Sequence, residues 1–265
     1  MDKRIIAAAL AGTLIWAGAA DSRPLRGRPA AVASRAPADV AAAVASADRP
    51  ADQVKLDESR KPAQVLAFEG LKRGDMALDL FTGGGYYAEI MGKAVGPRGG
   101  VVAWEPANFL NDKTRAAFAA LKQRTPNVGI RATPVNALSL PASTFDFVML
   151  HLNYHDLYWE SVKYGFPRTD PAAILRTLYQ SVKPGGTVAV VDHAGPAGDT
   201  RALVEKYHRI DPATVKADFE RAGFVLEAES NVLRNPADDH SKEVFDPAIR
   251  GNTDRFVYRF RKPRG

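Results

Sequence analysis

A glycine-rich turn between an apolar run and a helical pattern constrains this chain more than any other feature. The apolar run, residues 76–81, contains one acid, Asp79, and leads through Thr82 into three glycines, 83–85. Glycine suits a loop that adopts positive φ and brings its main-chain N–H groups close to a ligand. The helical pattern from Tyr86 onward would present its positive N-terminal end to the same ligand. The segment therefore predicts a site for a nucleotide-type ligand.

Composition sets the class of protein. The chain has 265 residues, of which 46% are hydrophobic and 25% charged, as in a globular protein with one large domain. Because it has no cysteine, a disulfide framework, a thiolate metal site and a cysteine nucleophile are excluded. The net charge of +6 is spread along the sequence rather than gathered in one run, so we expect no nucleic-acid partner.

The N-terminus has the pattern of an export signal. A positively charged start at residues 2–4 precedes a short apolar run, 5–16, and small residues at 17–19. This pattern predicts a signal peptide over residues 1–20, cleaved before Ala20 or Asp21, and hence an exported, periplasmic protein. No other apolar run is long enough for a membrane helix, so we expect no stable membrane span in the mature chain.

The next segment differs in composition from everything after it. Residues 21–55 are rich in Ala, Pro and Arg and contain few large aliphatic side chains. Such a segment buries too little apolar surface to offset the entropy of ordering it, although the alanines of 38–47 allow a transient helix. The sequence therefore predicts a flexible linker over 21–55 and a folded domain over 56–265.

Within that domain, segments with strand and helix periodicity alternate. Residues 147–150 and 188–191 are continuous apolar runs, as expected for parallel strands covered on both faces. The pattern predicts a doubly wound α/β fold. The expected strands are 76–81, 100–105, 128–132, 145–152, 187–192, 224–229 and 255–261, and the expected helices are 62–71, 86–95, 113–122, 171–182 and 212–222.

Two cofactors fit the glycine loop. Residues 83–88 satisfy the dinucleotide pattern GxGxx[GA], and Glu105 ends the next predicted strand, where a ribose-binding acid belongs. A nicotinamide-dependent oxidoreductase is therefore one interpretation, and a turn that merely joins strand to helix is another. Asp79 favours a third, because a carboxylate repels a pyrophosphate and attracts a cationic amino group.

From Asp79 to Gly85 the chain resembles the class I S-adenosylmethionine-dependent methyltransferases, whose first motif reads acid-x-Gly-x-Gly-x-Gly. Phe81 departs from this motif, since it stands in place of the first glycine and adds bulk close to the cofactor's path. Glu105 matches the acid that holds the ribose hydroxyls, and Asn136 takes the place of the Asp that faces the adenine amine. The resemblance implies these cofactor-binding residues: Asp79, Thr82, Gly83, Gly84, Gly85, Glu105, Asn136 and His151.

Further motifs follow in the family's order, at residues 145–151, 178–187 and 222–224. The resemblance spans about residues 60–263, and with 153–159 after the fourth strand it is greatest to predicted methyltransferases that carry a signal peptide. It implies a Rossmann-like, mostly parallel seven-stranded sheet with an antiparallel last strand. It also implies S-adenosylmethionine as the cofactor and methyl transfer to a small molecule as the reaction.

Candidate catalytic side chains follow the fourth and fifth predicted strands, where ligands of open α/β sheets bind. We hypothesise that His155 or His193 is the general base, with Asp156 as its orienter or as an alternative base. His151 and His155 are four residues apart, but they straddle a predicted strand end rather than lie on a helix, so no metal site is predicted.

Two long connections, 154–170 and 231–254, are expected to shape the substrate pocket. Aromatic residues in the first of them favour an aromatic or apolar acceptor. An exported protein is separated from the cytoplasm, where the methyl donor is made. An alternative is therefore an exported protein that binds a nucleoside ligand and has lost catalysis. Oligomeric state is not predicted.

Overall fold

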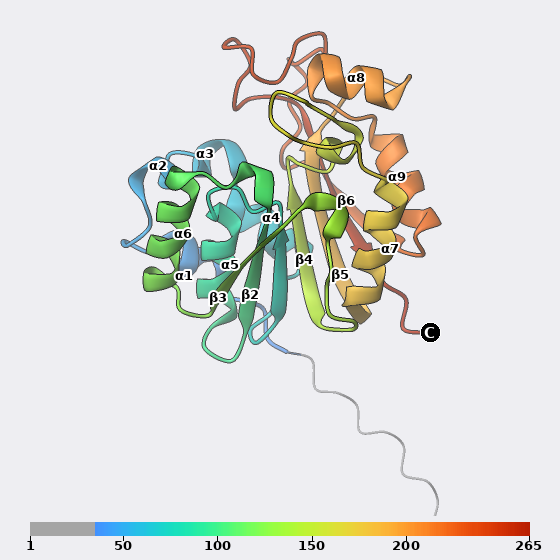
Figure 1. Cartoon of the computed structure of the whole chain (residues 1–265). Coiled ribbons are helices and arrows are strands. Elements are labelled where there is room, and N and C mark those ends of the chain that lie inside the picture. Colours follow the sequence, from blue (N-terminus) through green and yellow to red (C-terminus); the bar gives the residue numbers. More distant parts are fainter. Residues whose placement is uncertain (1–34) are drawn as a thin grey trace, which may run out of the picture. The chain divides into compact units, whose positions relative to one another are not determined.

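The computed structural model describes residues 35–265 (Figure 1). Seven strands form one sheet in the order β3-β2-β1-β4-β5-β7-β6. The first five strands pair in parallel, whereas β7 pairs antiparallel with both β5 and β6. The predicted doubly wound, mostly parallel sheet with an antiparallel last strand is confirmed. The strands are β1 (Met76–Leu80), β2 (Gly100–Pro106), β3 (Val128–Thr133), β4 (Phe145–His151), β5 (Val182–His193), β6 (Val225–Ser230) and β7 (Arg255–Arg261).

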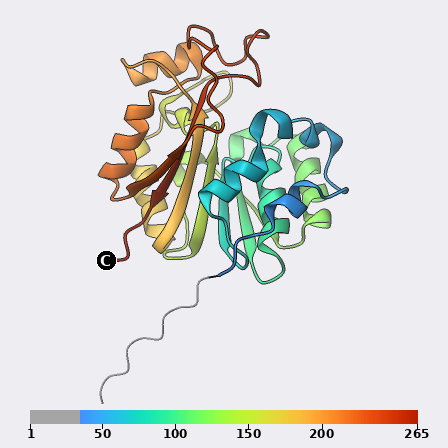
Figure 2. The same cartoon turned by 180° about the vertical axis from the view of Figure 1, so that it is seen from behind.

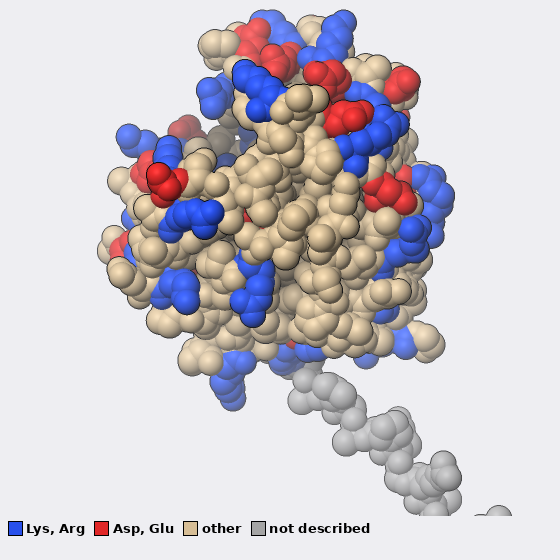
Figure 3. All heavy atoms as spheres, viewed as in Figure 1, with Lys and Arg blue, Asp and Glu red and all other residues tan. Residues whose placement is uncertain are grey.

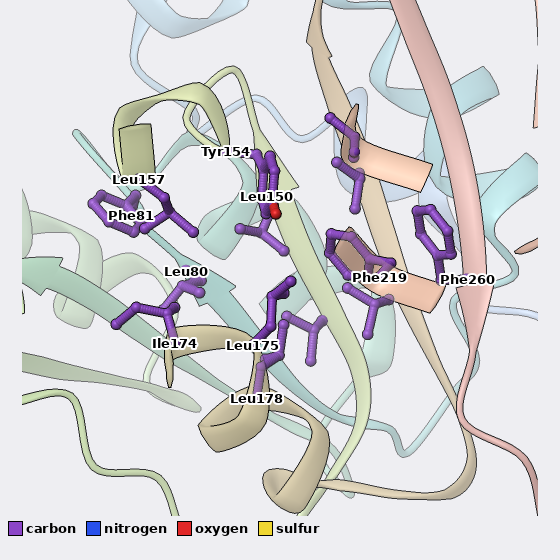
Figure 4. Close-up of a cluster of buried hydrophobic side chains, with 14 of the residues drawn as sticks. Leu80, Phe81, Leu150, Tyr154, Leu157, Ile174, Leu175, Leu178, Phe219 and Phe260 are labelled. Atoms are coloured by element: carbon purple, nitrogen blue, oxygen red, sulfur yellow. The ribbon is translucent and has the colours of Figure 1, made fainter. Parts of the chain in front are cut away.

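Alternate residues of the central strands enter two separate cores. Leu78 of β1 and Val148 of β4 pack in one core, while their neighbours Ala77 and Met149 pack in the other. Because successive side chains of a strand point to opposite faces, this division means that both faces of the sheet are covered. Figure 4 shows part of the first core, in which side chains of β4, α7 and α9 meet.

Each face has its own helices. The first core includes side chains of α7 (Pro171–Ser181), α8 (Thr200–Tyr207) and α9 (Pro212–Arg221). The second includes side chains of four other helices, and in Figure 2, the view from behind, the two earliest of them (blue and cyan) lie toward the viewer. The four helices are α1 (Val40–Val44), α4 (Pro62–Glu69), α5 (Tyr86–Val95) and α6 (Asp112–Arg124).

Local signals explain where the helices begin. Asp211 accepts a hydrogen bond from the backbone N–H of Ala213, and Pro212 occupies the first turn of α9. Asn111 and Thr114 form a capping box at α6. The five predicted helices and seven predicted strands are found with shifts of a few residues at their ends. Helix α8, capped by Asp199, was not predicted.

The structure contradicts the predicted flexible linker over residues 35–55. Val40 and Ala43 of α1 are buried against α4 and α5, and Arg49 forms a buried ion pair with Asp57 at 2.7 Å. The small alanine side chains let α1 approach the domain closely, which compensates for the scarcity of large aliphatic residues. Two short helices follow, α2 (Ala51–Val54) and α3 (Asp57–Arg60). The predicted signal peptide and residues 21–34 lie outside the described residues.

The surface carries both signs of charge. Figure 3 shows Lys and Arg side chains scattered over the face seen in Figure 1, several of them beside Asp or Glu side chains. Within residues 35–265, no helix is both long and apolar enough to cross a membrane.

Candidate functional site

A cavity of about 600 Å³ lies at the carboxyl ends of β1, β2 and β4. The glycine loop forms one wall, the residues after β4 form another, and the start of α6 contributes Asn111 and Thr114. Ligands of open α/β sheets bind beyond the carboxyl ends of strands, so the cavity occupies the predicted place. The predicted site residues that line it are Asp79, Thr82, Gly83, Gly84, Glu105, His151 and Asp156.

The glycine loop has the backbone that its sequence predicts. Gly83 and Gly85 adopt φ of +57° and +83°, in the left-handed region that favours glycine. A Cβ at Gly83 or Gly84 would meet no atom within 4 Å, whereas one at Gly85 would lie 2.6 Å from Leu121 of α6. The first two glycines therefore leave open space beside the loop, and Gly85 instead permits close packing of α6.

Phe81 explains why glycine is usual at its position in the motif. Its φ is +60°, a conformation that is strained for a residue with a side chain. The ring lies 5.3 Å from Trp104, centroid to centroid, in an edge-to-face arrangement. Figure 4 shows the Phe81 ring beside other side chains of the first core. Asn153 donates hydrogen bonds to the carbonyls of Leu80 and Phe81 and so holds the strained turn. Much of the bulk expected near the cofactor is thus absorbed by the core, although Phe81 also lines the cavity.

Two carboxylates flank the glycine loop. Asp79 accepts a hydrogen bond from the Thr82 hydroxyl at 2.6 Å, and Glu105 accepts one from the Gly83 N–H at 2.8 Å. Burial raises the pKa of Asp79 to about 6, although Thr82, the Ala88 N–H and Arg60 favour the ionised form. Burial, together with Asp79 and Asp156, raises the pKa of Glu105 to about 7. This wall is therefore suited to a ligand that brings positive charge or hydrogen-bond donors.

His155 is buried behind the cavity wall. Its Nδ1 lies 2.8 Å from Asp192 Oδ1, its backbone N–H donates to Asp192 Oδ2, and its Nε2 lies 3.4 Å from Asp156 Oδ1. Burial disfavours the imidazolium, but the two carboxylates outweigh burial and raise the pKa of His155 to about 9. Burial raises the pKa of Asp156 to about 6, against the opposing effect of His155. Of the two residues, only Asp156 lines the cavity.

The structure does not bring His193 or Asn136 to the cavity wall. His193 is buried, and its Nδ1 lies 2.7 Å from the Thr253 hydroxyl. Burial and the positive charges of His155 and Arg255 hold the pKa of His193 well below its usual range. Asn136 is exposed and donates its side-chain amide to the Arg168 carbonyl.

Three histidine rings lie close together: the ring centroid of His193 is 5.8 Å, and that of His208 is 5.7 Å, from that of His155. His240 instead lies 3.0 Å from Asp254. Among the described residues, no group of three or more His, Asp or Glu side chains is placed to hold a metal ion.

The two long connections that were expected to shape the substrate pocket contribute little to this cavity. Phe166 of the first connection is buried and stacks on Phe109 and Trp159, so these aromatic rings extend the core. Of both connections, 154–170 and 231–254, only Asp156 lines the cavity.

The outer wall comes instead from the N-terminal helices, which the sequence interpretation missed. Gln53, Leu56 and Arg60 line the cavity, and the Gln53 side chain donates to the Gly84 carbonyl at 3.1 Å. Gln53 lies in α2, Leu56 directly before α3 and Arg60 at the end of α3, so no single helical period in the sequence marks them as one group.

Residues 78–190 match the family described as "Methyltransferase domain". The chain is 24% identical over 182 residues to the ubiquinone/menaquinone biosynthesis C-methyltransferase UbiE of Pasteurella multocida. The match covers 66% of this chain and 62% of that relative.

Solved structures share the fold. An S-adenosylmethionine-dependent methyltransferase from Aquifex aeolicus is 22% identical with a TM-score of 0.56, over 83% of this chain and 96% of that one. A Burkholderia thailandensis 1,6-didemethyltoxoflavin-N1-methyltransferase, solved with S-adenosylhomocysteine, is 16% identical with a TM-score of 0.50, over 80% of each chain. Residues 78–190 therefore resemble a methyltransferase domain, and the chain shares the fold of S-adenosylmethionine-dependent methyltransferases.

Proposed function

We propose that this protein transfers a methyl group from S-adenosylmethionine to a small-molecule acceptor. One observation carries the proposal: the cavity at the strand ends combines the open glycine loop with two buried carboxylates, Asp79 and Glu105. The methyl donor has a cationic amino group and ribose hydroxyls, which are the partners such carboxylates accept. A pyrophosphate would add negative charge beside both acids, so the nicotinamide alternative is disfavoured.

The residues present fit the donor. Space for a ligand beside Gly83 and Gly84 is open. Four buried polar atoms of the lining residues have no hydrogen-bond partner among the described residues: Gln53 Oε1, Tyr87 OH, His151 Nε2 and Asn153 Oδ1. Buried polar groups are nearly always paired, so a ligand that supplies complementary groups would complete this site.

The bound donor supplies an electrophilic methyl group on a sulfonium, and transfer leaves S-adenosylhomocysteine. The acceptor's nucleophile forms the new bond to the methyl carbon, and the carbon–sulfur bond breaks with its electron pair remaining on sulfur. For an O–H or N–H acceptor, we propose that Asp156 takes the proton, because its carboxylate reaches the cavity. His155, held by Asp192, is then a positioning residue that keeps Asp156 ionised and oriented.

This assignment adopts the alternative in which Asp156 is the base, and His155, hypothesised from sequence as the base, becomes the residue that orients it. The reason is geometric: the two residues are adjacent in the chain, but the 3-10 helix η3 (His155–Tyr158) turns the imidazole toward Asp192 and leaves the carboxylate at the cavity. His193 is not placed to serve as base, since it neither lines the cavity nor contacts Asp156 within 4.0 Å.

Thermal unfolding with S-adenosylmethionine, S-adenosylhomocysteine and NAD in turn tests the cofactor. A ligand at about 100 times its Kd adds roughly 2.7 kcal/mol to the folded state, so the first two should raise Tm and NAD should not. Transfer of labelled methyl groups to a panel of small molecules with hydroxyl or amino groups then tests catalysis. Cofactor binding without transfer to any acceptor would favour the nucleoside-binding alternative.

The proposed base has its own test. Asp156→Asn should lower kcat by about 10²- to 10⁴-fold. His155→Gln should move the acidic limb of the kcat profile, near pH 6 in the wild type, to higher pH, because the cation beside Asp156 is lost. An unmoved acidic limb would remove His155 from this role.

We also propose that the protein is exported and works in the periplasm. The charged start, short apolar run and small residues of positions 2–19, together with the absence of cysteine, support this proposal. Cell fractionation and mass measurement of the purified protein provide the test. A mature chain that begins at Ala20 or Asp21 is expected, and an uncleaved chain in the cytoplasmic fraction would refute export.

A further inference from the structure

A second cavity, of about 380 Å³, is separate from the cavity at the strand ends. It is bounded by the end of α3, by residues 233–235 after β6 and by residues 251–255, which lead into β7. Among the described residues, none lines both cavities. The second cavity is therefore a candidate site that the proposed function does not use.

Arg255, the first residue of β7, brings a buried positive charge to this cavity. The residue is 3% exposed. Its guanidinium donates to the carbonyls of Ser59 and Gly251 at 2.7 and 2.6 Å and to the Thr253 hydroxyl at 3.0 Å, and all three acceptors are neutral. Burial, together with the charge of Arg60, lowers the pKa of Arg255 to about 10. A buried charge with neutral partners alone lacks a counter-ion.

The acids near Arg255 are bound to other cations. Asp192 and Asp238 favour the charged form of Arg255, but within residues 35–265 no carboxylate lies within 4.0 Å of its guanidinium. Asp192 lies 2.8 Å from His155, and Asp238 lies 2.9 Å from Arg209. Neither acid lines the second cavity. An anion that enters this cavity would therefore supply the counter-ion that the chain does not.

The rest of the lining adds positive charge. Lys61 forms no ion pair among the described residues, and its Nζ donates to the Val232 carbonyl at 2.9 Å. Arg234 is balanced by Asp254, 2.8 Å away. Glu58 is the one acid that lines the cavity within the described part of the chain, and its side chain is exposed to solvent. The cavity is thus positive in balance.

These charges suit a phosphate group. Guanidinium and ammonium groups both bind phosphate through charge-assisted hydrogen bonds. A phosphate group carries close to two negative charges at pH 7 and so matches Arg255 and Lys61 together, whereas a carboxylate matches one of them. The volume of about 380 Å³ lies within the range of ligand pockets, so the cavity also has room for an organic group attached to the phosphate.

We propose that Arg255 and Lys61 form a phosphate-binding site in this second cavity. The ligand is inorganic phosphate or the phosphate group of a small metabolite, and both bring the same dianion. Since Arg255 joins the end of α3 to residues 251–253, bound phosphate would also strengthen the contact between these two segments. The site does not depend on the proposed function, because its residues do not line the cavity at the strand ends.

Calorimetry and thermal unfolding in phosphate-free buffer test the site, with inorganic phosphate and glucose 6-phosphate as probes and sodium chloride of equal ionic strength as the control. At least one probe should raise the wild-type Tm above its value in chloride. Lys61→Met should raise the Kd of that probe about 10-fold. Lys55→Met, which removes a charge from an exposed position outside both cavity linings, should leave the Kd unchanged.

Arg255→Met should abolish the heat of binding, and Arg255→Lys should restore part of it. Because Arg255 is buried and Lys61 is exposed, Lys61→Met tests the site even if Arg255→Met does not fold. A Tm of Lys61→Met near that of Lys55→Met will show that the variant is folded.

The two probes identify the source of the phosphate. A Kd at least 10-fold lower for inorganic phosphate than for glucose 6-phosphate would support the free ion, and the reverse would support a phosphorylated metabolite. The site is refuted if the wild type binds neither probe, if Lys61→Met and Lys55→Met bind the probe equally, or if acetate binds more tightly than phosphate. Saturating S-adenosylhomocysteine should leave the Kd of the probe unchanged, and competition between the two would place the anion in the other cavity and overturn the proposal.

Discussion

Two buried carboxylates near the ends of the two strands that flank β4 have opposite surroundings. Asp79 is the last residue but one of β1, and Asp192 is the last residue but one of β5. Both of these strands pair with β4. Asp192 accepts hydrogen bonds from the His155 ring, the His155 N–H and the His193 N–H, all at 2.8 Å. Asp79 has the Thr82 hydroxyl as its side-chain partner and lines the cavity.

The difference separates a carboxylate that the protein satisfies from one that a ligand must satisfy. Asp192 has a cationic imidazole in contact and does not line the cavity, so its charge serves the position of His155. Burial opposes the ionisation of Asp79, and among the described residues no cation lies within 4.0 Å of its carboxylate to offset this effect. A buried charge that lacks its partner identifies where an incoming cation is expected.

Removal of His155 should give the largest effect on stability. His155→Ala leaves Asp192 buried without its cation, and we expect the free energy of unfolding at pH 7 to fall by about 3–5 kcal/mol. Urea denaturation measures this loss. The folded-state pKa of His155, about 9, lies above its ordinary value of 6.5. Its stabilising effect is therefore complete below about pH 6.5 and is lost as the pH rises through about 9.

The variant supplies the control for that pH dependence. Wild-type stability should decline between about pH 6.5 and 9, and the decline should be smaller in His155→Ala. Equal slopes in the two proteins, or a loss below about 1 kcal/mol at pH 7, would show that Asp192 does not depend on this imidazole.

Asp79→Asn should have the opposite effect to His155→Ala, because it should weaken ligand binding and leave stability unchanged. The amide keeps the size of the side chain but removes the charge, so the affinity for S-adenosylhomocysteine should fall about 10- to 100-fold, or about 1.4–2.8 kcal/mol. The free energy of unfolding without ligand should not fall, because burial opposes the charged form. Calorimetry and urea denaturation on the same preparation measure both quantities. A destabilised variant with unchanged affinity would make Asp79 a structural residue like Asp192.

Local patterns in the sequence were sufficient for most of the fold. The apolar run before Asp79 and the helical pattern after Gly85 predicted β1, the loop and α5, since strand and helix periods are properties of short segments. Helix α8 was missed because Val204 is its one buried residue, so its apolar signal is weak. Helix α1 was missed because its stability comes from contact with α4 and α5, which composition does not reveal.

For the site as well, local motifs predicted some residues, whereas contacts between distant parts of the chain decided the rest. Asp79, Thr82 and Glu105 were predicted because their motif is local, and they do line the cavity. The orientation of His155 and Asp156 is set by a contact with Asp192, 37 residues away, so spacing could not assign their roles. Arg60 was missed because its segment had been assigned to the linker and the start of the domain, where no motif marks it.

The pH dependence of binding tests whether the ligand supplies the cation that Asp79 lacks. An ammonium bound beside Asp79 favours the ionised carboxylate, whose pKa without ligand is about 6. Affinity for S-adenosylhomocysteine should therefore fall as the pH drops below about 6, by at most about tenfold per pH unit for one group. It should also fall above about pH 8, where an α-amino group loses its proton. A flat acidic side in the wild type, or one unchanged in Asp79→Asn, would contradict the assignment.

His193→Ala should have the smallest effect and thereby shows how far the Asp192 network extends. Asp192 accepts a hydrogen bond from the backbone N–H of His193, and the substitution keeps this bond. The His193 ring has the neutral Thr253 hydroxyl as its hydrogen-bond partner. We expect a loss of roughly 1–3 kcal/mol in the free energy of unfolding, from one hydrogen bond and the space left by the ring. Affinity for S-adenosylhomocysteine should be unchanged, because the ring does not line the cavity. A loss of stability as large as that of His155→Ala would mean that the two histidines form one unit with Asp192, because a lone neutral imidazole cannot account for it.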